Sequence, residues 1–264
     1  MTALRWYLGT MGFSYDDWKG VFYPHSLEKR EYLAYYSQFF NAVEMDSTFY
    51  GTPRPEYVQR WTQVTPDDFI FCPKMPRQIT HEQRLQNAEE EVAGFLQTMR
   101  LFENKLGPIL IQFPPDFTRA EIDNLERFLD SLPRDLDYAV EFRHRSWHAT
   151  ETGEMLQARN MCWASAEYVH MPQRVYVTTD FLFIRWIGRH GAFDTKDRER
   201  VDKTTSLRQW LEDIEQRRED GFHTVYGFFN DEYAGFAPAT CQKFKRLAGL
   251  PVKPLTPPQQ ARLL

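Results

Sequence analysis

Short apolar runs recur along the chain, and most of them end on a charged or amide side chain. Eight runs are rich in β-branched and aromatic residues: 7–10, 42–46, 69–74, 109–112, 138–143, 162–166, 182–187 and 225–230. A strand that is buried on both faces reads as a continuous apolar run. Strands that alternate with helices are typical of a parallel sheet. The pattern predicts an α/β fold, an eight-stranded parallel (β/α)₈ TIM barrel.

The segments between the runs show helical spacing, because their apolar residues recur every three or four positions. The longest stripe consists of Leu85, Ala88, Val92, Phe95, Met99 and Phe102. Thr118 and Glu121 have the spacing of a capping box ahead of the next stripe. Between Ala166 and Asp180, Pro172 and polar residues replace a clear helical pattern. We therefore expect the sixth helix to be irregular or missing.

The length of 264 residues suits one barrel of about 250 residues. We expect a single domain over residues 1–250 and a Pro-containing C-terminal tail over 251–264. The net charge of −5 argues against nucleic-acid binding. No signal-peptide pattern and no membrane-spanning run is present, so we expect a cytoplasmic protein. Cys72, Cys162 and Cys241 lack metal-ligand spacing and are expected to be buried, reduced thiols.

Polar side chains stand at the ends of the predicted strands. They are Glu44, Asp46, Lys74, Gln112, Glu141, Arg143, Arg185 and Asn230. Active sites of barrels of this type lie at the C-terminal ends of the strands. These side chains therefore predict one polar site that binds a small-molecule substrate.

The two glutamates of this set can perform acid–base chemistry. In a site that excludes water, the pKa of Glu44 or Glu141 can rise enough for general acid catalysis. If both flank a glycosidic bond, a carboxyl separation of about 6.5 to 9.5 Å is expected for an inverting glycosidase. Alternatively, each carboxylate forms an ion pair with a neighbouring cation and has only a structural role in the site.

Lys74, Arg143 and Arg185 come from three different strands. Converging cations bind phosphate or carboxylate groups, and arginine does so through a planar pair of donors. An anionic substrate follows from this interpretation. The alternative is a set of ion pairs with the acidic residues of the same strand ends.

Aromatic residues follow the first strand beside several glycines. Tyr15 and Trp18 are the candidates for stacking on a ligand. Phe22 and Tyr23, just before Pro24, are expected to pack beneath the loop instead.

Histidines offer two further possibilities. His81 follows the third strand, where an imidazole can transfer protons or form structural hydrogen bonds. His144 and His148 follow the fifth strand and, with Glu141, are of the types that ligate metals. A divalent metal is thus an alternative, although the spacing defines no geometry. No glycine-rich nucleotide loop occurs, so no cofactor is predicted.

With these motifs in view, the chain resembles the YecE-like family, which is also called domain of unknown function 72 (DUF72). The resemblance rests on segments 9–15, 22–24, 40–50, 73–74, 79–81, 106–108, 112–115, 141–144, 146–147, 229–230 and 237–238. It implies a TIM barrel and no established reaction. Tyr50, at the end of the segment 40–50, joins the substrate-binding candidates.

Four positions depart from the usual family pattern. Asp46 replaces a common asparagine, Ile187 and Phe236 replace histidines, and Met11 replaces a small polar residue. A mechanism that requires either histidine is therefore not expected in this chain.

Three classes of function remain open. The leading hypothesis is an enzyme, a hydrolase or isomerase, that acts on a small polar or anionic substrate. Its catalytic residues would be Glu44, Glu141, Lys74 and Arg143. The substrate-binding residues would be Tyr15, Trp18, Asp46, Tyr50, His81, Gln112, Arg185 and Asn230. The alternatives are a metal-dependent phosphodiesterase or nuclease and a noncatalytic metabolite-binding module. The oligomeric state stays open.

Overall fold

A computed structural model describes residues 3–169 and 171–255 and has a mixed α/β fold with parallel sheets. The strands are β1 (Arg5–Thr10), β2 (Ala42–Met45), β3 (Ile70–Pro73), β4 (Ile109–Gln112), β5 (Tyr138–Glu141), β6 (Cys162–Trp163), β7 (Ser165–Tyr168), β8 (Phe181–Gly188) and β9 (Thr224–Phe229). The α-helices are α1 (Tyr32–Tyr36), α2 (Pro55–Val64), α3 (Glu89–Met99), α4 (Ile122–Ser131), α5 (Thr150–Gln157), α6 (Thr204–Gln216), α7 (Asp231–Ala234) and α8 (Ala237–Leu247). Short helical turns follow several strands.

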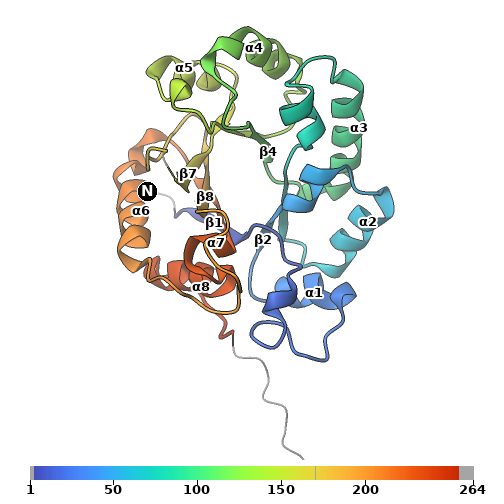
Figure 1. Cartoon of the computed structure of the whole chain (residues 1–264), viewed down its shortest axis with the longest axis vertical. Helices are drawn as coiled ribbons and strands as arrows, with labels where there is room; N and C mark the ends of the chain where they lie inside the picture. Colours follow the sequence, from blue (N-terminus) through green and yellow to red (C-terminus); the bar gives the residue numbers. More distant parts are fainter. Residues whose placement is uncertain (1–2, 170, 256–264) are drawn as a thin grey trace, which may run out of the picture.

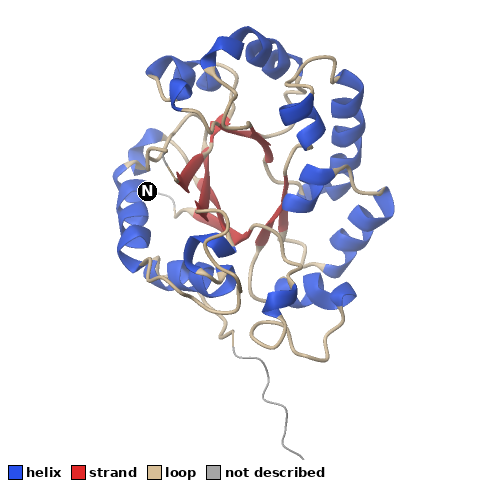
Figure 2. Cartoon of the chain, viewed as in Figure 1, coloured by secondary structure: helices blue, strands red, loops and turns tan. Residues whose placement is uncertain are grey.

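The strands pair in parallel within three sheets, in the orders β1-β9-β8-β7, β2-β3 and β4-β5-β6. Single parallel bridges join strands of different sheets, between Met11 and Glu44 and between Lys74 and Leu110. Figure 2 shows the strands grouped at the centre with the helices around them. In Figure 1 the chain passes from α1 to α8 around this centre. Parallel pairing brings the C-terminal ends of the strands to one side.

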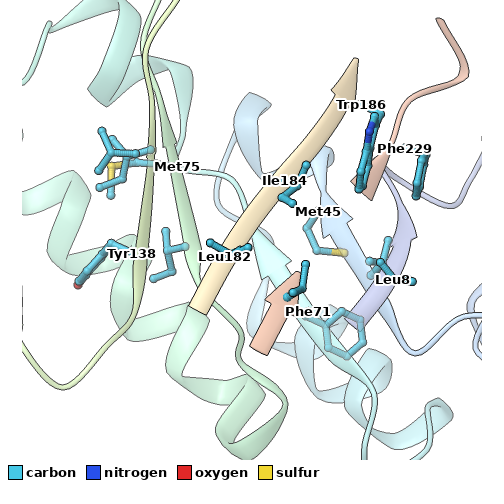
Figure 3. Packing of buried hydrophobic residues seen from close by; sticks show 14 of the residues in the cluster. Leu8, Met45, Phe71, Met75, Tyr138, Leu182, Ile184, Trp186 and Phe229 are labelled. Atoms are coloured by element: carbon cyan, nitrogen blue, oxygen red, sulfur yellow. The ribbon is translucent and has the colours of Figure 1, made fainter. Parts of the chain in front are cut away.

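Alternate residues of each strand enter two different apolar clusters. The helix-face cluster includes Val43 and Met45 of β2 and packs under the helices. Figure 3 shows part of it, including Met45, Ile184 and Trp186. The strand-face cluster includes Ala42 of β2, and its buried members lie on the strands or directly beside them. Because side chains alternate along a strand, Glu44 lies on the same face as Ala42.

The strand-face cluster combines small residues with aromatic ones. It consists of Met11, Ala42, Ile70, Cys72, Leu110, Ala139, Cys162, Ala164, Phe181, Phe183, Ile187 and Phe228. The closest approach is between β1 and β2, where a Cβ atom on Gly9 would lie 1.9 Å from the carbonyl oxygen of Ala42. Small residues here bring neighbouring strands close together.

Most predicted elements are present, with differences at their ends. The predicted strand 162–166 is divided into β6 and β7 by Ala164. Among the described residues between Tyr168 and Phe181 there is no helix, which agrees with the expected loss of the sixth helix. All three cysteines are buried and unpaired, as predicted.

One local prediction is wrong. Thr118 makes no side-chain capping bond, and Glu121 instead accepts a hydrogen bond of 2.9 Å from Nε of Arg84. A charged partner binds a carboxylate more strongly than a backbone amide does, which explains the difference.

The described part of the C-terminal tail, residues 251–255, has no regular secondary structure, and residues 256–264 lie outside the described residues. In the part of the chain that the structure describes, no helix combines the length and apolar character needed to cross a membrane.

Candidate functional site

Arg185 joins two of the predicted catalytic carboxylates. Its Nε and Nη2 atoms donate to the two carboxylate oxygens of Glu44 at 2.8 and 2.7 Å. Its Nη1 atom donates to Oε2 of Glu141 at 2.6 Å. All three side chains are almost completely buried. The C-terminal ends of β2 and β5 and the interior of β8 are therefore joined by one network of charge-assisted hydrogen bonds.

The two carboxylates titrate differently. Burial raises the pKa of Glu141, but Arg143 and Arg185 outweigh this effect and lower it to about 2. Burial raises the pKa of Glu44 to about 7, against the opposing charge of Arg185 and with a contribution from Asp46. Burial also lowers the pKa of Arg185, yet Glu141 and Glu44 raise it above its usual value. Glu141 is thus an anion at neutral pH, whereas Glu44 can hold a proton.

In this network the two carboxylates are not free for the expected glycosidase arrangement. The guanidinium of Arg185 lies between Glu44 and Glu141 and binds both. A sugar cannot take that place unless the buried ion pairs break, and breaking such a pair is costly. The alternative prediction, that these carboxylates pair with cations and order the site, describes the geometry better.

Arg143 extends the network toward the surface. Its Nε atom donates to Oε1 of Glu141, and its guanidinium carbon lies 4.0 Å from the ring centroid of Tyr168. Its Nη1 and Nη2 atoms make no hydrogen bond with any described residue. Arg143 therefore keeps donors for a ligand while its position is determined by Glu141 and Tyr168.

Lys74 differs from the other charged residues of the site. Its side chain is buried, and its Nζ atom lies 3.9 Å from the ring centroid of Phe49. Within residues 3–169 and 171–255, its ammonium group has no hydrogen bond and no ion pair. Burial lowers the pKa of Lys74 to about 8, and the charge of Arg185 acts in the same direction. A cation–π contact supports the ammonium without occupying its donors.

Thr48 holds the backbone of Lys74. The Oγ1 atom of Thr48 donates to the carbonyl of Lys74 at 2.6 Å and accepts from the amide of Lys74 at 2.9 Å. Because Thr48 and Phe49 follow β2, the turn after β2 positions the lysine at the end of β3.

His81 also contacts Phe49. The two ring centroids are 5.0 Å apart in an edge-on arrangement, and Nδ1 of His81 lies 2.8 Å from Oγ1 of Thr80. Burial lowers the pKa of His81 to about 4, and the charges of Lys74, Arg77 and Arg143 add to this effect. The imidazole is consequently neutral at physiological pH.

Gln112, Asp46 and Asn230 also lie at strand ends. Gln112 stands opposite Glu141 in the β4–β5 register and donates to the carbonyl of Phe113. Asp46 lies close enough to influence the pKa values of Glu44 and Lys74, where burial is the largest cause. The side-chain oxygen of Asn230 caps α7 by accepting from the amide of Glu232 at 2.9 Å.

The structure separates the two aromatic candidates of the first loop. Trp18 is completely buried, and its Nε1 atom donates to Asp231 at 3.2 Å, so it has no accessible face for stacking on a ligand. The prediction that Trp18 contacts a ligand is therefore wrong, because the buried carboxylate of Asp231 holds the indole within the core. Tyr15 is half-buried and donates to the carbonyl of Met11 at 2.5 Å. The predicted packing of Phe22 and Tyr23 beneath the loop is confirmed.

Other candidates lie apart from this centre. Tyr50 is exposed and contacts Phe49 edge-on. His148 interacts with the hydroxyl of Tyr176 at 2.7 Å, and among the described residues it makes no contact with Glu141. Among the described residues, no group of three His, Cys, Asp or Glu side chains is arranged to hold a metal ion.

Two family departures make contacts with residues described above. The Nη2 atom of Arg185 approaches Sδ of Met11 at 3.5 Å, so this methionine covers the guanidinium. Phe236 is buried and packs edge-on against Trp18. An apolar side chain here adds to the packing of the first loop.

Sequence reasoning missed Phe49, Tyr168 and Asp231. Phe49 follows the strand-end residues of β2, and Tyr168 alternates with Ala166 on β7, so strand periodicity indicates both positions. Asp231 directly follows the last strand-end residue. Burial raises its pKa to about 7, and it accepts hydrogen bonds from Trp18 and from the amide of Ala237.

Comparison with known proteins places this geometry in a family. The model of the family described as "Protein of unknown function DUF72" matches residues 7–262. The UPF0759 protein YecE of Escherichia coli (strain K12) is 37% identical over 154 residues, which are 58% of this chain and 53% of that protein. The UPF0759 protein YunF of Bacillus subtilis (strain 168) is 32% identical over 148 residues, 53% of this chain and 51% of that protein. The matched segment is thus about half the length of these curated relatives.

Solved structures share the fold over a longer range. The DUF72 family protein TM1631 of Thermotoga maritima MSB8 has a TM-score of 0.78 and 30% identity, covering 93% of this chain and 99% of its own. The DUF72 family protein EF0366 of Enterococcus faecalis V583 has a TM-score of 0.73 and 23% identity, covering 94% and 99%. The second similarity concerns the fold alone.

Proposed function

The chain belongs to the DUF72 family of proteins of unknown function, and on this premise we propose that it is an isomerase-type enzyme for a small anionic substrate. Lys74 is its proton-transfer residue. One observation carries this proposal. The amine of Lys74 is buried, makes no hydrogen bond or ion pair with the described residues, and lies beside a network in which Glu44, Glu141 and Arg185 satisfy one another.

The chemistry follows from the pKa of this amine. With a pKa of about 8, a fraction of Lys74 is a free base near neutral pH. Its lone pair can take a proton from a carbon next to a substrate carbonyl, and the C–H electron pair then forms an enolate. The resulting ammonium returns the proton to a neighbouring atom. Arg143 holds the anionic part of the substrate, and neutral His81 offers a hydrogen bond.

We also propose that the strands close into one TIM barrel that forms a single domain. Two bridges support this proposal, because Met11 with Glu44 joins β1 to β2, and Lys74 with Leu110 joins β3 to β4. β6 and β7 are separated by one residue and join the remaining two sheets. The polar residues would then surround one barrel mouth, which is where such folds carry their active sites.

Deuterium exchange tests the role of Lys74. The protein is incubated in D2O with a panel of phosphorylated and carboxylated hydroxy-carbonyl compounds and with neutral analogues. Mass spectrometry then detects deuterium bound to carbon. We expect exchange in at least one anionic compound and a decrease of about 100-fold or more in Lys74→Met, the range of general acid–base catalysis.

Lys29→Met is the matched control, since Lys29 is exposed and pairs with Asp16. Circular dichroism and thermal unfolding establish that both variants fold. Full exchange activity in folded Lys74→Met contradicts the proposal. Tight binding of a panel compound without exchange by the wild-type protein supports a noncatalytic binding module instead.

A further inference from the structure

A cationic pocket adjoins the network at Arg143. Its volume is about 490 Å³. Its lining includes Pro115, Arg143, His144, Arg145, Tyr168, Arg189 and His190. Among the described residues that line it, none is acidic, although the chain as a whole carries a net charge of −5. The concentration of one charge sign in a hollow indicates an anion-binding site.

The pocket is built by the segments that follow three strands. Arg143 and His144 follow β5, Tyr168 ends β7, and Arg189 and His190 follow β8. Gly188 turns the chain at the end of β8 with a φ of 77°, and a Cβ atom there would lie 2.1 Å from the carbonyl oxygen of Glu232. A glycine is therefore required at the turn that leads to Arg189 and His190.

Arg143 connects this pocket with the proposed catalytic centre. Its Nε atom is bound to Glu141, and its ring contact with Tyr168 restrains the guanidinium plane. Its two terminal nitrogens have no partner within the described chain, so they remain as a donor fork. This arrangement is preorganised for a tetrahedral or planar anion.

His144 supplies a donor of defined orientation. The amide of Ser146 donates to Nδ1 of His144 at 3.1 Å, so Nδ1 carries no proton in this arrangement. The ring N–H then lies on Nε2, which makes no hydrogen bond with a described residue. The hydroxyl of Ser146 accepts from the amide of Arg119 at 2.9 Å and holds this turn in place.

We infer that this pocket binds the phosphate monoester group of the substrate, an inference that rests on the proposed function and specifies its substrate class. A phosphate monoester offers three terminal oxygens and a charge of about −1.5 to −2. The guanidinium groups of Arg143 and Arg189 and the Nε2–H of His144 provide more donors than one carboxylate accepts. Arg143 is bound to Glu141 at the end of β5, and Lys74 bridges to Leu110 of the neighbouring β4, so a phosphate anchored at Arg143 leaves the rest of the molecule on the side of Lys74.

Titration with inorganic phosphate tests this inference directly. Isothermal titration calorimetry and NMR shifts compare phosphate with acetate for the wild-type chain and for Arg189→Met. Arg189 is exposed, so this variant is expected to fold. We expect phosphate to bind at least about tenfold more tightly than acetate, and Arg189→Met to weaken it about tenfold, the effect of one charge-assisted hydrogen bond.

Two further variants separate this inference from the proposed function. Arg60→Met changes an exposed arginine on α2, outside the pocket, and should leave phosphate affinity unchanged. Lys74→Met should abolish deuterium exchange but keep phosphate affinity within about threefold, because Lys74 does not line the pocket. Retained phosphate binding with lost exchange supports both proposals.

Three results with the wild-type chain and Arg189→Met contradict the inference that this pocket binds phosphate, and a fourth comes from Lys74→Met. They are the absence of phosphate binding, equal affinity for phosphate and acetate, and unchanged affinity in Arg189→Met. Loss of phosphate binding in folded Lys74→Met also overturns it, because the anion would then lie at the lysine. None of these results alters the deuterium-exchange test with carboxylated compounds, which judges Lys74 separately.

Discussion

Arg185 is the residue on which the buried charges converge. It binds Glu44 and Glu141 from strands that are distant in sequence, and its side chain is only 3% exposed. Two carboxylates in the interior require such a cation, because unpaired buried charges are strongly unfavourable. Arg185 therefore maintains the site, whereas Lys74 carries the proposed reaction.

Replacing Arg185 tests this role. Arg185→Met leaves Glu44 and Glu141 without their shared partner, and we expect the free energy of unfolding to decrease by about 3–5 kcal/mol. Chemical denaturation monitored by tryptophan fluorescence measures the change. The triple variant with Glu44→Gln and Glu141→Gln should recover part of the loss. Arg100→Met, which removes an exposed pair with Asp135, should have a much smaller effect. A similarly small effect of Arg185→Met would contradict this role.

Among the elements, β1 and β2 show how small residues determine the distance between strands. No side chain fits at Gly9, since a Cβ atom would overlap the carbonyl oxygen of Ala42. Two residues further along, Met11 and Glu44 form a parallel bridge between the same two segments. The contact between β1 and β2 thus determines the position of one carboxylate of the network.

Two glycine substitutions should have opposite effects. Gly9→Ala pushes β1 away from β2, and we expect it to destabilise the fold by about 1–3 kcal/mol, the usual effect of overpacking. Gly94→Ala lies in α3 with nothing within 4 Å and should stabilise the fold by about 0.5–1 kcal/mol. Thermal and urea unfolding of the two variants measure both changes. Equal changes in the free energy of unfolding for the two variants would contradict the close approach of Gly9 to Ala42.

For the molecule as a whole, buried carboxyls determine how stability depends on pH. Asp231 has its pKa raised to about 7 by burial, from a usual value of 3.8. Between these pH values the unfolded chain releases the proton and the folded chain keeps it. The contribution of Asp231 to stability is therefore complete below pH 3.8 and is lost as the pH rises toward 7.

Asp231→Asn should remove this dependence while keeping an oxygen that accepts from the amide of Ala237. Relative to this variant, the wild-type chain should lose up to about 1.4 kcal/mol of stability per pH unit between about pH 4 and 7. Urea unfolding at several pH values measures the difference. Asp67→Asn changes an exposed carboxyl and serves as the control. A constant difference between wild type and Asp231→Asn over this range would show that Asp231 ionises normally.

Sequence patterns predicted the strands and most of the strand-end residues, because burial on both faces leaves a local apolar signature. Glu44 and Glu141 lie within the last two residues of β2 and β5, and Lys74 directly follows β3, whereas Arg185 lies inside β8 and not at its end. Which of these charged groups pair with one another could not be predicted, because the pairing depends on distances between segments that are up to 141 residues apart in the sequence. For the same reason the sequence predicts a ligand contact at Trp18, whereas the fold buries this side chain and bonds it to Asp231.

The alternation of apolar and polar residues along the chain was sufficient to predict which segments are strands or helices and which polar side chains stand near the strand ends. Burial of a helix or strand leaves a periodic pattern in the local sequence. Pairing, burial and pKa shifts depend on how distant segments pack. Packing of these segments joined Glu44 and Glu141 through Arg185, left the amine of Lys74 against Phe49, and brought Arg143, His144 and Arg189 into one pocket. Electrostatic energies depend on distance and on solvent exclusion, and both arise only after the strands have assembled.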